Sequence, residues 1–394
     1  MENNTVHINP AQPQIAAGEM PAAIPAAEAA APAPGFDSKG REKRYMFIRK
    51  MNSVGCTMLV NILLQTVAAM QVVIIVMLVW MLWNMTSVDN LMSMIENGDA
   101  EFTEAVMLCA IAANAVAMPI AHLLSGYLHS VRNGFTIGSV MGRTRWRGSG
   151  FWGATVLALG ATYAWMFVYM ILGWLMPDSM FANGAFTSSN YEGASTARMI
   201  VTALYVCIGA PLTEEFLCRG VLLKSMSKYG VPFAVFATSL IFGLIHGNLY
   251  QTPFAILVGV VLGYVAVRSG SIWPGVIIHF IVNTFATARD LAMAFLPEYR
   301  SAVLYFFYGL AGLLVLGSVI ILCTGSKKIC WQPIDRESNS LLLPEVRTKV
   351  RCKPLFMLLA ISLLVVIVIY LFSILVSSGV TFGMEELIPV QEMQ

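Results

Sequence analysis

The residues best suited to chemistry in this sequence are two adjacent carboxylates and an arginine within an apolar segment. Glu214, Glu215 and Arg219 occur in the stretch APLTEEFLCRG, which has apolar residues on both sides. An ionisable side chain at such a depth in a membrane costs at least about 2.5–3.5 kcal/mol and by default marks a functional site. On a helix, Glu215 precedes Arg219 by four positions, the order that favours an ion pair. Glu214 points about 100° away, so we expect Glu215 to be structural and Glu214 to be free for chemistry.

Two later segments carry polar side chains that we expect at the depth of Glu214. After a short turn, the next helix carries Phe242 and, one turn further on, His246. Glu214 and His246 are each about 15 residues from that turn, or roughly 23 Å along two antiparallel helices. A third helix carries His279 and Asn283, which share a face because they are four residues apart. The sequence therefore predicts that Glu214, His246, His279 and Asn283 converge near mid-membrane.

Proline and glycine positions refine the expected geometry of these helices. Pro211 and Pro274 each suit the first turn of a helix, so we expect one helix to begin at Pro211 and another at Pro274. Gly243 lies between Phe242 and His246 and would allow a neighbouring helix to approach closely.

This set of side chains fits hydrolysis of a peptide bond. The Glu214 carboxylate and the His246 imidazole could share a water molecule and remove its proton. His279 and Asn283 could then donate hydrogen bonds to the oxyanion of the tetrahedral intermediate. Alternatively, Glu214, His246 and His279 could hold a divalent metal such as Zn²⁺ that activates the water. The spacing does not form an HExxH zinc helix, and the residues leave both mechanisms open.

Each of these residues also has a structural interpretation. An ion pair such as Glu215–Arg219 usually braces a helix, and an asparagine in a span is usually a contact between helices. A single histidine in a span is usually a hydrogen-bonded packing residue, so we assign no role to His122 and His129. The matched depth of the polar side chains described above favours a site over coincidence.

Composition places the chain in the membrane. Of its 394 residues, 57% are hydrophobic and 12% are charged, whereas soluble proteins carry about 25% charged residues. Its mean hydropathy is +0.71. Apolar runs long enough to cross a bilayer recur along the chain and predict an all-α, polytopic transmembrane bundle of about nine helices. The predicted ranges are 56–83, 105–128, 151–176, 198–224, 231–249, 253–268, 272–289, 301–323 and 354–378.

The distribution of charge predicts how the chain is oriented. Lys and Arg are frequent in alternate loops and absent from 84–104 and 177–196, so the positive-inside rule predicts a cytoplasmic N-terminus and an external C-terminus. Residues 1–44 are rich in Ala and Pro and are predicted to be a disordered tail. No basic stripe with interleaved aromatic residues is present, so we expect no nucleic acid partner. The seven cysteines show no CxxC or metal-finger spacing.

Three short motifs resemble those of a known family. Glu214-Glu215-x-x-x-Arg219, Phe242-x-x-x-His246 and His279-x-x-x-Asn283 are similar in order and spacing to the motifs of CPBP-family proteases, also called the Abi family. That family includes the type II CAAX prenyl endopeptidases. The resemblance covers about residues 198–290, and Cys218 stands where an aromatic residue is common.

The resemblance implies an intramembrane endopeptidase with its site among the helices. Residue by residue, Glu214 and His246 would activate water, His279 and Asn283 would form the oxyanion hole, and Glu215 and Arg219 would brace the helix. Phe242 would support the motif. Members are described both as metalloproteases and as metal-independent glutamate proteases, so Zn²⁺ remains an open expectation. The expected partners are the lipid bilayer and a membrane-associated peptide or protein substrate, and the expected location is a bacterial plasma membrane.

These observations predict four regions. A tail (1–44) and N-terminal membrane helices (45–196) precede the protease-like region (197–290), and C-terminal helices with a basic cytoplasmic segment follow (291–394). Two other functions use the same buried polar residues: an ion-coupled transporter, and a non-catalytic scaffold in immunity or regulation. The lack of matching Gly/Pro-broken segments in two halves of the chain disfavours the transporter.

Overall fold

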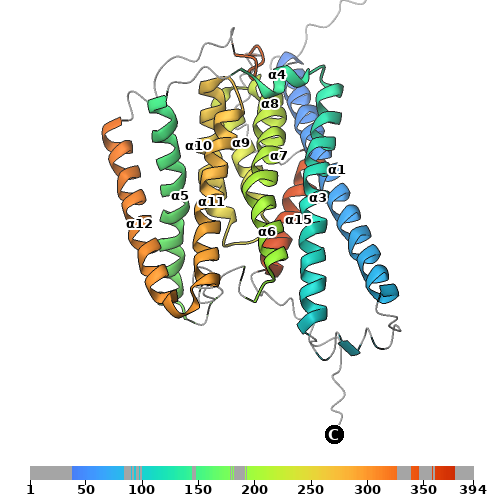
Figure 1. The fold of residues 1–394 in the computed structure, drawn as a ribbon. Helices are drawn as coiled ribbons and strands as arrows, with labels where there is room; N and C mark the ends of the chain where they lie inside the picture. The colour runs from blue at the N-terminus through green and yellow to red at the C-terminus, as the bar shows by residue number, and fades with distance from the viewer. Residues whose placement is uncertain are drawn as a thin grey trace, which may run out of the picture. The chain divides into compact units, whose positions relative to one another are not determined.

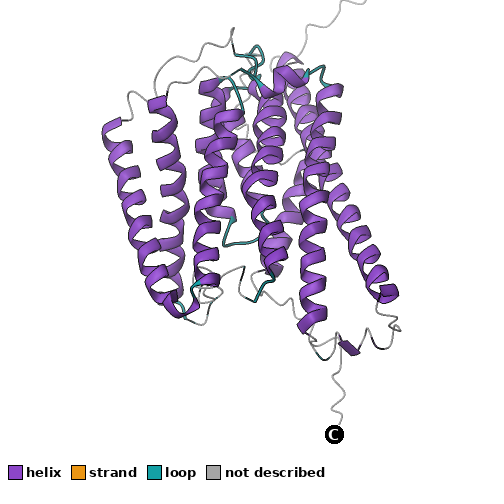
Figure 2. Cartoon of the chain, viewed as in Figure 1, coloured by secondary structure: helices purple, strands orange, loops and turns teal. Residues whose placement is uncertain are grey.

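Apolar helices dominate the computed structural model of the chain. It describes residues 38–83, 90, 93–94, 97, 100–143, 148–177, 179, 181, 191, 193–325, 339–345, 357 and 360–377. Among these residues, seven helices are long and apolar enough to cross a membrane, and Val231–Leu244 and Ile361–Ser377 are shorter apolar helices. The same described residues form no β-strand. The expectation of an all-α, polytopic helical bundle is confirmed (Figures 1 and 2).

Figure 1 labels the α-helices, and the bounds of all described helical segments are as follows. They are α1 (Ser38–Trp83), α3 (Ala100–Arg132), α4 (Ile137–Met141), α5 (Gly148–Leu175), α6 (Thr196–Leu204), η1 (Tyr205–Gly209), α7 (Ala210–Glu215), η2 (Phe216–Leu223), α8 (Lys224–Ser227), α9 (Val231–Leu244), α10 (Thr252–Ser269), α11 (Trp273–Phe295), η3 (Pro297–Tyr299), α12 (Arg300–Ile320), η4 (Ile321–Gly325) and α15 (Ile361–Ser377).

Each predicted helical range has a counterpart, but several ends differ. Helix α1 begins at Ser38, so residues 38–44 of the predicted tail are helical. Residues 1–37 of that tail lie outside the described residues, as do 326–338 and 346–353 of the predicted basic segment. Helix α11 continues to Phe295, beyond the predicted end at 289.

The helices that carry the polar side chains pack around one another. Helix α10 packs against α9 and α5, and α11 packs against α7, η1 and α10. Helix α3 contacts α6, α7 and η2. A Cβ placed on Gly243 of α9 would lie 2.8 Å from the Thr252 carbonyl oxygen of α10, so the close approach predicted at Gly243 is confirmed. The acidic segment is thereby held between α3 and the α9–α11 group.

The segment that carries Glu214 is one continuous helical run with two wide turns. From Thr196 to Ser227 the chain is helical throughout, which agrees with the predicted range 198–224. Pro211 lies in the first turn of α7 as expected, but the helical run continues through it, so no separate helix starts there. The π-helical segments η1 and η2 flank α7 on its two sides. In η1 the Ala210 N–H donates to the carbonyl of Tyr205, five residues back. This wider hydrogen-bonding pattern accommodates Pro211, which has no N–H to donate.

Candidate active site

One cavity of about 280 Å³ is lined by the side chains that the sequence predicted to converge. Glu214 reaches it from α7, His246 from the turn after α9, and His279 and Asn283 from α11. Phe242 of α9 also lines it. The other lining residues are Met118, Tyr205, Val206, Ala210, Ile245, Gln251, Phe254, Ala255, Val258 and Val282. Four polar groups from segments far apart in the sequence therefore face one space.

Glu214 is buried in this cavity without a hydrogen-bonding partner on one oxygen. The residue is 4% exposed, and its Oε2 has no partner among the described residues. The nearest cationic candidate is Nε2 of His279 at 3.9 Å. That separation is too long for a direct hydrogen bond, but one water molecule could bridge the two atoms.

His246 lies in the turn after α9, two residues beyond the last helical residue, instead of within the helix as predicted. Helix α9 ends at Leu244, and Gly247 adopts a left-handed conformation (φ 63°), a common way to end a helix. The His246 Nδ1 lies 2.8 Å from the Phe242 carbonyl oxygen. A carbonyl can only accept, so in this contact Nδ1–H donates and the Nε2 of the neutral ring has its lone pair available.

His279 stands beside both carboxylates of the acidic pair. Its Nδ1 lies 3.4 Å from Glu215 Oε1, but that nitrogen has no hydrogen-bond partner of suitable geometry among the described residues. Its ring packs edge-on against Phe242, with ring centroids 5.6 Å apart. Phe242 makes a similar contact with His246 at 5.2 Å. The phenyl ring thus separates and orients the two imidazoles.

The predicted ion pair between Glu215 and Arg219 is confirmed. Arg219 Nη1 donates to Glu215 Oε1 at 2.6 Å, and both side chains are fully buried. Arg219 Nη2 also donates to the Gly259 carbonyl of α10 at 3.2 Å. The guanidinium group lies over the Phe242 ring, 4.2 Å from its centroid. Arg219 therefore connects α7 and η2 with α9 and α10 through these contacts.

Asn283 makes a contact that the sequence does not predict. Its Nδ2 donates to the Val206 carbonyl at 2.8 Å. In the wide turn that carbonyl has lost its usual donors, because Ala210 N–H donates to Tyr205 and Pro211 has no N–H. One amide hydrogen of Asn283 thus satisfies the opened turn next to Glu214, and the second N–H of the amide remains for the cavity.

The hydrogen bond from Asn283 to the Val206 carbonyl should contribute to the stability of the fold. Asn283→Ala should destabilise the protein by about 1–3 kcal/mol, because it leaves the partly buried Val206 carbonyl without a donor. In a Pro211→Ala background the same change should cost less, since the introduced alanine supplies an N–H for the Val206 carbonyl. Thermal unfolding in detergent of the two single variants and the double variant measures this coupling. Strictly additive costs would show that Pro211 and Asn283 do not serve the same carbonyl.

Two polar residues that line the cavity were not predicted from the sequence. Tyr205 lines it from η1, and Gln251 lines it from the turn before α10. Asn248 holds this turn, because its Nδ2 donates to Gln251 Oε1 at 2.9 Å and to the His246 carbonyl at 2.9 Å. The polar stretch GNLYQTP between two apolar helices could have indicated that Gln251 lies near the site.

The remaining histidines described lie outside this cavity. His129 contacts Thr57 at 2.6 Å and Ser225 at 2.9 Å, and His122 Nδ1 lies 3.3 Å from Thr213 Oγ1. Both residues are buried. Their contacts match those of hydrogen-bonded packing residues.

The side chains that could bind a metal ion in this cavity are Glu214, His246 and His279. Within the described part of the chain, no group of three or more His, Cys, Asp and Glu side chains is arranged to hold an ion. Glu215 Oε1 is engaged by Arg219, and His246 Nδ1 by a carbonyl. The arrangement does not present Glu214, His246 and His279 as a ready set of ligands, and a metal at these residues stays a prediction.

Comparison with known proteins agrees with the motifs. Residues 196–285 match the family model described as Type II CAAX prenyl endopeptidase Rce1-like. The matched segment contains all the motif residues from Glu214 to Asn283, and the resemblance to CAAX proteases is confirmed. No curated protein and no solved structure matches the chain. At the level of the family, the match supports a CAAX-type intramembrane protease.

Proposed function

We propose that this chain, whose segment 196–285 matches the CAAX prenyl endopeptidase family, hydrolyses a peptide bond of a membrane-associated peptide or protein. The observation that supports this most is the cavity itself. It brings a buried carboxylate, two imidazoles and a carboxamide together from α7, the turn after α9, and α11. Family membership alone does not assign these roles; the geometry of the side chains supports them.

In the proposed reaction, Glu214 and His246 activate the attacking water. The unpartnered Oε2 of Glu214 and the free Nε2 of His246 are both acceptors, so together they can orient a water molecule and take its proton. The hydroxide oxygen bonds to the carbonyl carbon of the substrate. The accepted proton passes to the leaving nitrogen as the C–N bond breaks, which yields a carboxyl terminus and a free amine.

His279 and Asn283 are proposed to stabilise the oxyanion. Nε2 of His279 lies 3.9 Å from Glu214 Oε2, so a His279 ring with its proton on Nε2 would place a donor beside the attacking water. Asn283 keeps one amide hydrogen for the same cavity while the other holds the Val206 carbonyl. Donors that are fixed before the reaction stabilise charge that develops in the transition state. Asn283 would thus combine oxyanion binding with positioning of the turn that precedes Glu214.

The proposal includes the membrane in which the protein lies and its orientation in that membrane. The alternation of Lys- and Arg-rich loops favours a cytoplasmic N-terminus, and we propose a bacterial plasma membrane. The substrate would reach the cavity from within the bilayer or from its surface. Prenylated proteins are one class of candidate substrate, and unmodified membrane peptides are another.

The experiment that tests the proposal compares membrane peptides from cells that express the wild-type chain or the Glu214→Gln variant. Peptide termini that require the wild-type protein and are lost with the variant support a peptidase, and their sequences identify the scissile bond. Identical termini in both samples would contradict it and leave the scaffold or the transporter. Repeating the cleavage with purified protein and a chelator tests the metal: activity that is lost and then restored by Zn²⁺ supports a metal at this site.

A further inference from the structure

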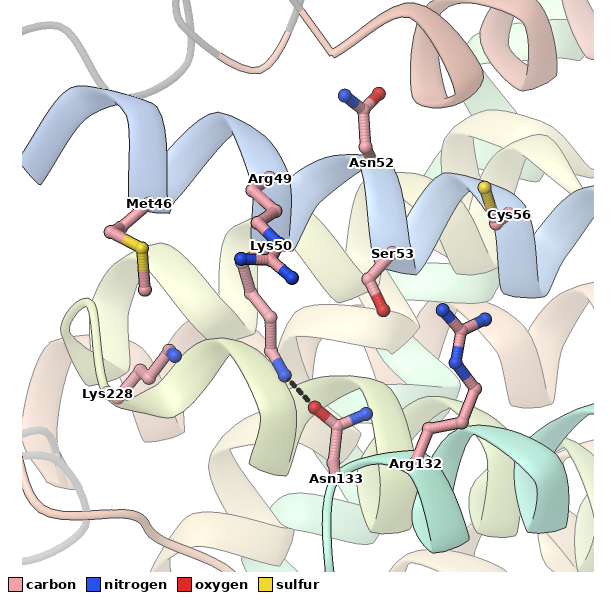
Figure 3. A pocket seen from close by; sticks show the side chains of 9 residues that line it. All are labelled: Met46, Arg49, Lys50, Asn52, Ser53, Cys56, Arg132, Asn133 and Lys228. Atoms are coloured by element: carbon pink, nitrogen blue, oxygen red, sulfur yellow. Dashed lines mark hydrogen bonds between the residues drawn. The ribbon is translucent and has the colours of Figure 1, made fainter. Parts of the chain in front are cut away.

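A second cavity, of about 380 Å³, collects cations from three parts of the bundle (Figure 3). Arg49 and Lys50 come from α1, Arg132 from the last turn of α3, and Lys228 from the turn after α8. The other lining residues are Met46, Asn52, Ser53, Cys56 and Asn133. None of these residues belongs to the Glu214 cavity, so the two spaces are separate.

The positive charge in this cavity is not neutralised by the residues that line it. None of the nine lining residues that the structure describes is acidic. Lys50 Nζ donates to Asn133 Oδ1, a neutral acceptor. Lys228 Nζ lies over the Tyr229 ring, 5.1 Å from its centroid, and burial lowers the pKa of Lys228. Such a cluster is complementary to a phosphate group, which accepts several charge-assisted hydrogen bonds.

Exposed apolar side chains continue from the cavity along α1. Arg49, Ser53 and Cys56 line the cavity at helical spacing. The same face continues as Val60, Leu63 and Val67, which are 38%, 62% and 44% exposed. A phosphate bound at the cavity would therefore stand at the end of a partly exposed apolar stripe.

Helix α3 presents a second stripe beside the first. Its residues Leu128 and Leu124 lie one and two turns before Arg132 on the same face, and they are 45% and 40% exposed. Helices α1 and α3 are held together next to these stripes by Asn61, whose Nδ2 donates to Ser125 Oγ at 3.2 Å. The basic cavity and the two adjoining apolar stripes are therefore complementary to an amphiphilic molecule that has an anionic headgroup and apolar chains.

We propose that this basic cavity binds the phosphate-bearing headgroup of an anionic phospholipid, whose acyl chains lie along the exposed stripes of α1 and α3. Basic pockets between transmembrane helices recognise such headgroups. The cavity volume is sufficient for a glycerophosphate group, and the stripes distinguish a lipid from a free phosphate. This site is independent of the proposed peptidase activity.

Binding of phosphatidylglycerol to the purified chain in detergent, measured by native mass spectrometry, tests the proposal. The pocket variant Arg132→Gln/Lys228→Gln should bind phosphatidylglycerol roughly 30-fold more weakly, or about 1 kcal/mol for each cation. The control Arg44→Gln/Lys43→Gln removes the same charges from exposed positions of α1 outside the cavity and should bind like wild type. If the pocket variant binds within about threefold of this control, or if phosphatidylcholine binds equally well, the site is overturned.

A second measurement on the wild-type chain needs no variant and separates lipid from free phosphate. Cys56 is an exposed free thiol in the cavity, so its rate of modification by a maleimide can be read from its peptide by mass spectrometry. Phosphatidylglycerol should slow this modification, while phosphatidylcholine and inorganic phosphate should not. Equal protection by inorganic phosphate would make this a site for soluble phosphates, and no protection by phosphatidylglycerol would overturn the headgroup assignment.

Discussion

Glu214→Gln is expected to lower the rate of peptide cleavage by a factor of about 10²–10⁴, the usual contribution of a general base. The carboxamide has nearly the shape of the carboxylate but cannot take a proton from water. The rate is measured with purified protein in lipid vesicles that contain a membrane-tethered reporter peptide. The loss should appear in kcat more than in KM, because the substrate contacts of the cavity are retained.

A matched control separates this effect from a general loss of acidic charge. Glu298→Gln makes the same chemical change at an exposed residue of η3 and should leave the rate unchanged. Both variants should unfold at the wild-type temperature within about a degree or two, since neither carboxylate forms an ion pair with a described Lys or Arg side chain. Cleavage by Glu214→Gln at the wild-type rate would remove Glu214 from the proposed role.

Arg219→Ala is expected to destabilise the folded protein by about 3–5 kcal/mol, because it strands the Glu215 carboxylate in a fully buried position. The change also removes the donor to the Gly259 carbonyl and the cation over Phe242. Glu215 would then face His279 Nδ1, 3.4 Å away, without its main partner. The effect should therefore reach the cavity as well as the fold.

The double variant Glu215→Leu/Arg219→Met tests the origin of this cost. It replaces both charges by apolar side chains of similar volume, a change that is often neutral or stabilising in a buried pair. The double variant should therefore unfold at a higher temperature than Arg219→Ala when both are heated in the same detergent. Equal unfolding temperatures would contradict the view that the stranded carboxylate is the source of the instability.

Helical geometry explains how much of this site was predictable. The Glu215–Arg219 pair follows from a spacing of four residues, and the shared depth of Glu214 and His279 follows from a fixed rise per residue. These relations depend only on local backbone structure. They hold even though α7 lies between two π-helical segments.

The parts that were missed depend on contacts between distant segments. Pro211 resembles a helix start, yet the chain continues through it because η1 is wide and Asn283 satisfies the Val206 carbonyl. His246 leaves the helix because Gly247 adopts a left-handed conformation. Gln251 joins the cavity through the packing of α10 against α9, which no local pattern in the sequence specifies.

The most direct test of a single hydrolytic site is the cleavage rate of Glu214→Gln/His246→Ala compared with that of each single variant. Residues that activate the same water act as a unit, so their effects are strongly non-additive. If Glu214 and His246 share one water, the double variant should be about as slow as the slower single variant in long single-turnover incubations. A double variant whose rate loss equals the product of the two single losses would show that Glu214 and His246 act independently, and would contradict the shared site.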